Sequence, residues 1–200
     1  QTLAAEASER FPDHGPLTVT RGHFALLTGD VPGARTLANL AMQRVPRNFD
    51  AALLDGQVAL AEGNYTSALN AFERSSQLNT ASVAPLFAKG SLLAEMGNKE
   101  ELDKVIARAD KLGVDRGEIH MLKAESAMLG GDFQLAQNAL NSARKTMDGN
   151  PALRMLDGQI ALKLGNADIA ISQLTPLVSA QPGFARARLL LAEAYDKAGE

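Results

Sequence analysis

Residues that could carry acid–base or metal chemistry are few and scattered in this sequence. Its three histidines are His14, His23 and His120, and it has no cysteine. Neither a zinc-type spacing nor a Ser, His and Asp constellation can be assembled from them. The adjacent acids Glu100 and Glu101 are most simply the solvated first turn of a helix, where the helix dipole favours carboxylates. The sequence therefore predicts no catalytic residue, no metal site and no cofactor.

One segment resembles a ligand loop without the residues that would hold a ligand. DKLGVDRGE, residues 110–118, has the acids and glycines of a calcium loop but lacks alternating oxygen ligands and a glycine at the sixth place. No glycine loop followed by Lys and Ser or Thr is present to cradle a phosphate. We therefore expect a protein that is not an enzyme.

The composition argues against two classes of partner, nucleic acid and the membrane interior. Twenty Lys and Arg against 23 Asp and Glu give a net charge of −3, and aromatic residues are only 4%, which disfavours nucleic acid as a partner. No apolar run approaches the length of a membrane span, about 18 residues or more, so direct membrane insertion is not expected. The compartment stays open, with a periplasmic or exported setting favoured over the cytoplasm, and we expect that something upstream of Gln1 was removed.

The elements that organise the chain follow a repeat of constant length. DGQVALAEGN at residues 55–64 returns as DGQIALKLGN at 157–166, which is 102 residues, or three times 34, further on. We predict one array over residues 1–200, with 1–14 as the second helix of a preceding repeat and 185–200 as the first helix of a following one. The full repeats, without gaps, are 15–48, 49–82, 83–116, 117–150 and 151–184.

Each row of 34 reads as helix, tight turn, helix. Glycine ends a helix in the left-handed conformation without a Cβ penalty, and Asp or Asn beside it caps the next helix. Proline at position 32 then closes the second helix in some rows, as Pro12, Pro46 and Pro182. Position 15 is Gly29, Gly63, Gly97, Gly131, Gly165 and Gly199, and position 16 is Asp30, Asn64, Asn98, Asp132, Asn166 and Glu200.

Small residues at positions 8 and 20 are expected to let the two helices of a hairpin approach, beside a bulky apolar residue at position 24. In the second row these are Gly56, Ala68 and Phe72. The first row departs from the pattern, because position 24 is Ala38. We expect its hairpin to be filled from a neighbour such as Leu37, or to pack less well.

A 34-residue unit with small residues at 8 and 20, a bulky residue at 24 and proline at 32 resembles the tetratricopeptide repeat. The resemblance covers the whole chain and implies an all-α superhelix, or solenoid, of stacked hairpins. A second similarity, carried by phrases of the GQxALxxGN type, is to long repeat arrays of bacterial exopolysaccharide export and assembly proteins. The chain is thus expected to be a fragment of a longer bacterial array.

Charged residues occupy position 7, where the family usually has leucine: Arg21, Asp55, Lys89, Lys123 and Asp157. Because neighbouring signs often oppose, we predict a ladder in which position 7 of one repeat pairs with position 7 of the next. The alternative is a row of solvated charges, since exposed ion pairs contribute only about 0–1 kcal/mol each.

Positions 2, 5, 9 and 12 of the first helix share one face, which by resemblance lines the concave side of the superhelix. The alternative for position 5 is that it packs inside the hairpin. A terminal-carboxylate grip is disfavoured, because groove positions are mostly apolar or acidic, and an apolar helix or extended segment is the predicted ligand. The predicted groove residues are Val19, His23, Leu53, Gln57, Phe87, Ser91, Met121, Glu125, Met128, Met155, Gln159 and Leu189.

These patterns favour a non-enzymatic scaffold for protein–protein interaction, with bacterial exopolysaccharide assembly or export as the setting that the second similarity suggests. Two alternatives stay open: a docking arm of a larger enzyme or outer-membrane export protein, and a sensor module that takes a small ligand. Residues 1–10 and 186–198 are expected to expose apolar faces, which would fray or pair end to end between molecules.

Overall fold

The computed structural model describes residues 15–113 and 116–199, and every regular element in those ranges is an α-helix. This confirms the all-α class expected from the sequence. The predicted second helix at residues 1–14 lies outside the described residues. Helices of 12 to 15 residues alternate with short turns. They are α2 (Gly15–Leu27), α3 (Val31–Arg44), α4 (Phe49–Ala61), α5 (Tyr65–Leu78), α6 (Ala84–Glu95), α7 (Lys99–Asp110), α8 (Gly117–Leu129), α9 (Phe133–Met147), α10 (Pro151–Lys163), α11 (Ala167–Ala180) and α12 (Ala185–Ala198).

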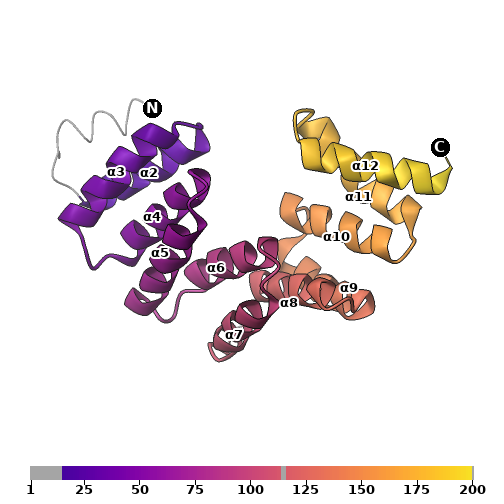
Figure 1. The fold of residues 1–200 in the computed structure, drawn as a ribbon, viewed down its shortest axis with the longest axis horizontal. Helices are drawn as coiled ribbons and strands as arrows, with labels where there is room; N and C mark the ends of the chain where they lie inside the picture. The colour runs from indigo at the N-terminus through magenta and orange to yellow at the C-terminus, as the bar shows by residue number, and fades with distance from the viewer. Residues whose placement is uncertain (1–14, 114–115, 200) are drawn as a thin grey trace. The chain divides into compact units, whose positions relative to one another are not determined.

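The chain divides into two compact units, Gln1–Leu92 and Leu93–Glu200, and the boundary falls within α6. In the first unit α2 packs on α3 and α4 on α5, while α4 also contacts α2 and α3 of the hairpin before it (Figure 1). In the second unit each helix from α7 to α11 contacts the next helix along the chain, and α10 also touches α8 and α12. Within each unit, hairpins therefore stack side by side as the repeat predicts.

The turns inside the hairpins form as predicted. The glycines at position 15 all have a positive φ, between 70° and 79°, which an L side chain would make costly. The next residue caps the second helix: Asp30, Asn64, Asn98 and Asp132 each accept a hydrogen bond from a backbone N–H three residues on. Asn166 has no side-chain cap bond. These two residues set the point at which each hairpin bends.

Helices also end where position 32 has no proline, and glycine supplies part of the reason. Gly113 follows α7 with a φ of 66°, and Gly149 follows α9 with a φ of 76°. At the end of α5, the Asn79 side chain instead accepts a hydrogen bond from Ala81 N. The second helices of these rows are thus terminated by turn residues.

The packing of small against large residues is confirmed in two hairpins. A Cβ added at Gly56 would stand 2.5 Å from Cδ1 and Cε1 of the Phe72 ring, which is fully buried. A Cβ at Gly158 would stand 2.7 Å from Leu174 Cγ. Because each glycine occupies the space against which the bulky side chain packs, the two helices can approach closely.

The first hairpin is filled in a different way from the one expected. A Cβ at Gly22 would overlap Leu54, a fully buried residue of α4, whereas Leu37 is only partly buried at the edge of the same cluster. The side chain that compensates for Ala38 thus comes from the next repeat. The expectation missed it because it considered only residues of the same row.

The predicted ladder between position-7 residues is wrong in its pairing. Four of these five charges instead form an ion pair with the second helix of the preceding repeat. Asp55 pairs with Arg35 at 2.6 Å, and Lys89 with Glu73 at 2.8 Å. Lys123 pairs in the same way with Asp110 at 2.8 Å, and Asp157 with Arg144 at 2.5 Å. The reason is packing: α4 contacts α3 more extensively than it contacts α2, and α10 contacts α9 more extensively than α8.

Candidate functional site

The position-5 residues of the predicted groove lie mostly in the core. Val19, Leu53, Met121 and Met155 are at most 8% exposed, as the alternative of packing inside the hairpin requires. Phe87 is half-buried, and Leu189 on α12 is 72% exposed. Four of the six can therefore offer a partner little surface, and their role in binding stays a prediction.

Position 9 is the accessible row of the same helix faces. His23, Gln57 and Ser91 in the first unit, and Glu125 and Gln159 in the second, are all half-buried. Each can hydrogen-bond a main chain or a polar side chain lying along the helix face. Within each unit, the face on which a ligand could lie is therefore centred on position 9.

Apolar side chains flank this row. Met128, three residues after Glu125 on α8, is half-buried, and Leu129 beside it is 42% exposed. Leu27, which stands at the same place in the first repeat as Leu129 in the fourth, is exposed as well. Sequence reasoning missed both leucines, because it followed the 3, 4, 3 spacing of positions 2, 5, 9 and 12. Polar position-9 groups with apolar neighbours suit a segment that is itself mostly apolar.

Glu125 is the most unusual group on the second unit's face. Its Oε2 atom is buried and has no hydrogen-bond partner in the described part of the chain. Burial raises the pKa of this carboxyl to about 7, and the negative charge of Glu95 on α6 adds to the rise, while the positive charge of Arg186 on α12 opposes it. At neutral pH this carboxyl is therefore divided between its protonated and ionised forms.

Arg186 is held by a different residue. In the amide orientation that satisfies both side chains, the Gln159 oxygen accepts hydrogen bonds from Arg186 Nη2 at 2.9 Å and Nε at 3.3 Å. Arg186 therefore acts on Glu125 through space without bonding it. The sequence identified Glu125 and Gln159 as groove residues. It did not single out Glu95 on α6 or Arg186 on α12, whose electrostatic effect on Glu125 only the fold shows.

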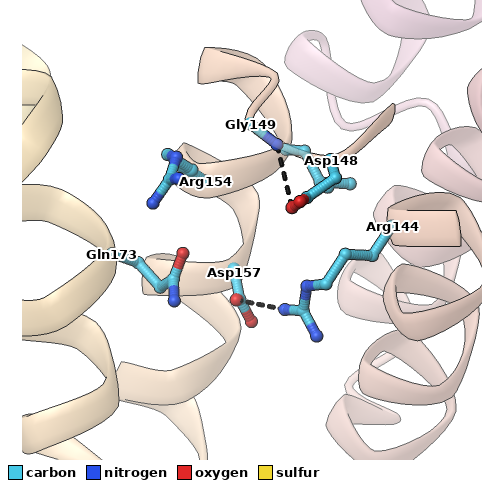
Figure 2. A pocket seen from close by; sticks show the side chains of 7 residues that line it. Arg144, Asp148, Gly149, Arg154, Asp157 and Gln173 are labelled. Atoms are coloured by element: carbon cyan, nitrogen blue, oxygen red, sulfur yellow. Dashed lines mark hydrogen bonds and ion pairs between the residues drawn. The ribbon is translucent and has the colours of Figure 1, made fainter. Parts of the chain in front are cut away.

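A separate polar pocket of about 180 Å³ lies between α9, α10 and α11. Figure 2 shows the Arg144–Asp157 ion pair on one side of it and the side chains of Arg154 and Gln173 on the other. Asp157 is almost fully buried and also accepts a hydrogen bond from Gln137 at 3.3 Å. The pocket is lined by two arginines and two aspartates, so it differs from the apolar pocket that a small-ligand sensor was expected to form.

Neither a metal-binding cluster nor a membrane-spanning helix is found in the described ranges. Between residues 15–113 and 116–199, no three His, Asp or Glu side chains gather as a metal site would require. No helix in those ranges is both long enough and apolar enough to cross a membrane.

A family model described as the tetratricopeptide repeat protein 21 ARM repeat matches residues 44–198, more than half of the chain. The chain belongs to this family. Its members are repeat proteins of the tetratricopeptide type, which agrees with the resemblance seen in the sequence and with the stacked hairpins of the fold.

A mouse relative, tetratricopeptide repeat protein 21A, is 24% identical over 203 residues, which cover 90% of this chain but only 15% of the relative. This chain thus corresponds to a small part of that protein's length. Two solved structures share the fold at 18% identity. One is TTC0263, a thermophilic repeat protein of Thermus thermophilus, with a TM-score of 0.77 over 90% of this chain and 98% of that one. The other is a chain of the APC/C hetero-tetramer Cut9–Hcn1, with a TM-score of 0.84 over 96% of this chain and 38% of that one.

Proposed function

We propose that this repeat array is an interaction scaffold that binds an apolar helix or extended segment of a partner protein along its first-helix faces. Scaffolding of other proteins is the general role of the tetratricopeptide-repeat family, and its members are generally non-enzymatic. The finer claim is the ligand and its place. It rests on one observation: half-buried polar position-9 side chains are bordered by accessible apolar ones, as at Glu125, Met128 and Leu129.

A surface of this kind suits a segment of a protein better than a small molecule. Apolar side chains of the segment would cover Met128 and Leu129, whose loss of water contact stabilises the complex by roughly 25 cal/mol per Å² of apolar surface. Main-chain groups of the segment would bond Gln57, Ser91 and other position-9 groups. The chain of Cut9–Hcn1 that shares this fold comes from a hetero-tetramer, and assembly with other proteins is the use we propose for this chain too.

The proposal is tested by selecting displayed dodecapeptides against the chain and measuring their affinity for variants. Phe87→Ala is expected to weaken the selected peptides about tenfold or more, because Phe87 is the half-buried aromatic of the first unit's face. Helix content should barely change, because the ring is not enclosed in the core.

Tyr65→Ala is the matched control, since Tyr65 is an exposed aromatic of the same unit at the start of a second helix. It should leave the affinity unchanged. Equal losses in the two variants, or a loss of stability without any loss of affinity in Phe87→Ala, would place the binding surface elsewhere.

The setting in a bacterial exopolysaccharide assembly or export system, in a periplasmic or exported location, is part of this proposal. It rests on the GQxALxxGN-like phrases at residues 56–64 and 158–166. A co-purified partner that takes part in polysaccharide export would support it, and a partner from an unrelated pathway would refute the setting while leaving the scaffold role intact.

A further inference from the structure

We infer that Glu125 is the recognition point for a lysine side chain of the bound segment, with Met128 packing against the lysine methylenes. This inference rests on the proposed function, since it names a chemical requirement on the segment that lies along α8. The geometry that carries it is a buried carboxyl oxygen without a hydrogen-bond partner on a face that otherwise offers apolar side chains.

The unpartnered oxygen is the first step of the argument. A buried polar atom without a partner costs about 1–3 kcal/mol, and more when the group is charged, so such atoms are rare and call for an explanation. Glu125 Oε2 lacks a partner among the described residues although the side chain as a whole is only half-buried. Because the fold leaves the buried end of this carboxyl without compensation, a group of opposite charge that reaches the exposed part of the side chain would stabilise its ionised form.

Charge decides which group that is. Glu95 faces the carboxyl from α6 and adds negative potential, which attracts a cation. Arg186 faces it from α12 but is bonded to Gln159, so the nearby positive charge does not neutralise the carboxyl by direct contact. An ammonium or guanidinium from a ligand would supply a counter-charge to the carboxylate, whereas a second carboxylate would be repelled.

The shape of the site favours lysine over arginine. Arginine binds carboxylates best through two parallel hydrogen bonds to both oxygens, and here Oε2 is covered. An ammonium is a compact charge with three donors, so it does not need two parallel bonds to both oxygens. Its four-carbon stem can lie along apolar surface, which Met128 provides on the same helix face.

Binding of a cation at this carboxyl is coupled to pH. A ligand ammonium stabilises the ionised form, so it must displace a proton wherever the carboxyl is protonated. With a pKa of about 7, the carboxyl is about 9% ionised one unit below, at pH 6, and about 91% ionised one unit above, at pH 8. Affinity for an ammonium should therefore rise about tenfold over that range.

The deciding experiment titrates the chain with n-butylammonium chloride, which carries the stem and charge of a lysine side chain, and follows the carboxyl ¹³C resonance of Glu125. We expect a saturable shift, about tenfold tighter at pH 8 than at pH 6, together with a shift of the Met128 methyl. Butan-1-ol, which has the same stem without the charge, should cause no saturable shift of the carboxyl.

Two variants make the result specific. Glu125→Gln should abolish the Met128 shift caused by butylammonium. Glu193→Gln, which removes an exposed carboxylate at position 9 of α12, should leave it unchanged. A Glu125 resonance that does not move, or that moves no more than that of Glu193, would refute the lysine site.

The peptide selection separates this inference from the scaffold proposal. Selected peptides with a lysine preference that Glu125→Gln removes would support both. Peptides that bind along these faces without any preference for lysine would refute the lysine site and leave the scaffold standing. If no peptide is selected, the scaffold proposal fails, and the butylammonium titration still decides whether Glu125 binds an ammonium group.

Discussion

Replacing Gly56 and Phe72, singly and together, tests whether close approach of two helices is what fixes each hairpin. The Phe72 ring is fully buried, and a Cβ at position 56 would stand 2.5 Å from two of its carbons. Truncation by Phe72→Ala should lower the free energy of unfolding by about 3–5 kcal/mol, through lost burial and the cavity left behind.

The effect of Gly56→Ala on the free energy of unfolding should depend on whether the Phe72 ring is present. With the ring present, the added methyl overpacks the contact at a cost of about 1–3 kcal/mol, partly offset by about 1 kcal/mol from the better helix propensity of alanine. With the ring removed, the nearest remaining atom is the Ala68 carbonyl oxygen at 3.3 Å, and only a small adjustment is needed. The methyl should then be neutral or stabilising, which gives a coupling of about 1–3 kcal/mol.

Urea unfolding of the four proteins, followed by far-UV circular dichroism, measures this coupling. Phe72→Ala combined with Gly158→Ala is the control, because Gly158 packs against Leu174 in the other unit and the two effects should add to within about 0.5 kcal/mol. If Gly56→Ala lowers the unfolding free energy equally with and without the ring, the space at Gly56 is not what allows Phe72 to pack there. The explanation given for the hairpin would then be wrong.

Three further predictions follow from contacts that the fold revealed. Because Leu54 fills the space beside Gly22, Leu54→Ala should lower the unfolding free energy by about 3 kcal/mol, and Leu37→Ala should lower it by clearly less. Urea unfolding measures both, and equal losses would contradict this packing. Arg144→Met should lower the unfolding free energy by about 2 kcal/mol, because it leaves the buried Asp157 carboxylate without its cation. Lys104→Met, which removes a solvent-exposed ion pair, is the control and should cause no measurable change. An unchanged unfolding free energy in Arg144→Met would mean that the buried pair is not needed for stability. Because the folded state holds the Glu125 proton more tightly than the unfolded state, the unfolding free energy should fall by up to about 3 kcal/mol as pH rises from about 4.5 to 7. Glu125→Gln should remove that fall in a series of urea titrations. If the variant keeps the same pH profile, the pKa of Glu125 is not raised.

Much of the fold could be predicted because its signals are local and repeated. Gly63 and Asn64 specify a helix stop and a helix start at adjacent positions, and the same pair of functions recurs in each of the first four full repeats. Local signals of this kind need no knowledge of tertiary contacts. The contact of Phe72 with Gly56 could be predicted too, since both residues belong to one hairpin and the turn already fixes where that hairpin bends.

Contacts between repeats could not be read in the same way. The pairing of Asp55 with Arg35, and the filling of the space at Gly22 by Leu54, depend on how far one hairpin is displaced and rotated on the next. A one-dimensional period carries no information on that rotation. Sequence reasoning therefore placed charges in the correct row but joined them to the wrong partners.

The candidate site was predictable in part for the same reason. Helical spacing identified Glu125 and Gln159 as residues at the same position of successive first helices, and both are half-buried. It assigned Met121 to the same face, but the depth of that residue depends on the helix packed behind it, and it is 2% exposed. The raised pKa of Glu125 arises from burial and from Glu95 on α6, which only the stacked arrangement brings together.

The six methionines provide the most direct test of where a partner binds, because their methyl groups can be followed separately by NMR. Met128 lies on the proposed face of α8, whereas Met42 and Met147 lie on the second helices α3 and α9. On titration with a selected peptide, the account predicts a saturable shift of the Met128 methyl and none at Met42 or Met147. Shifts confined to Met42 and Met147, with Met128 unmoved, would contradict it.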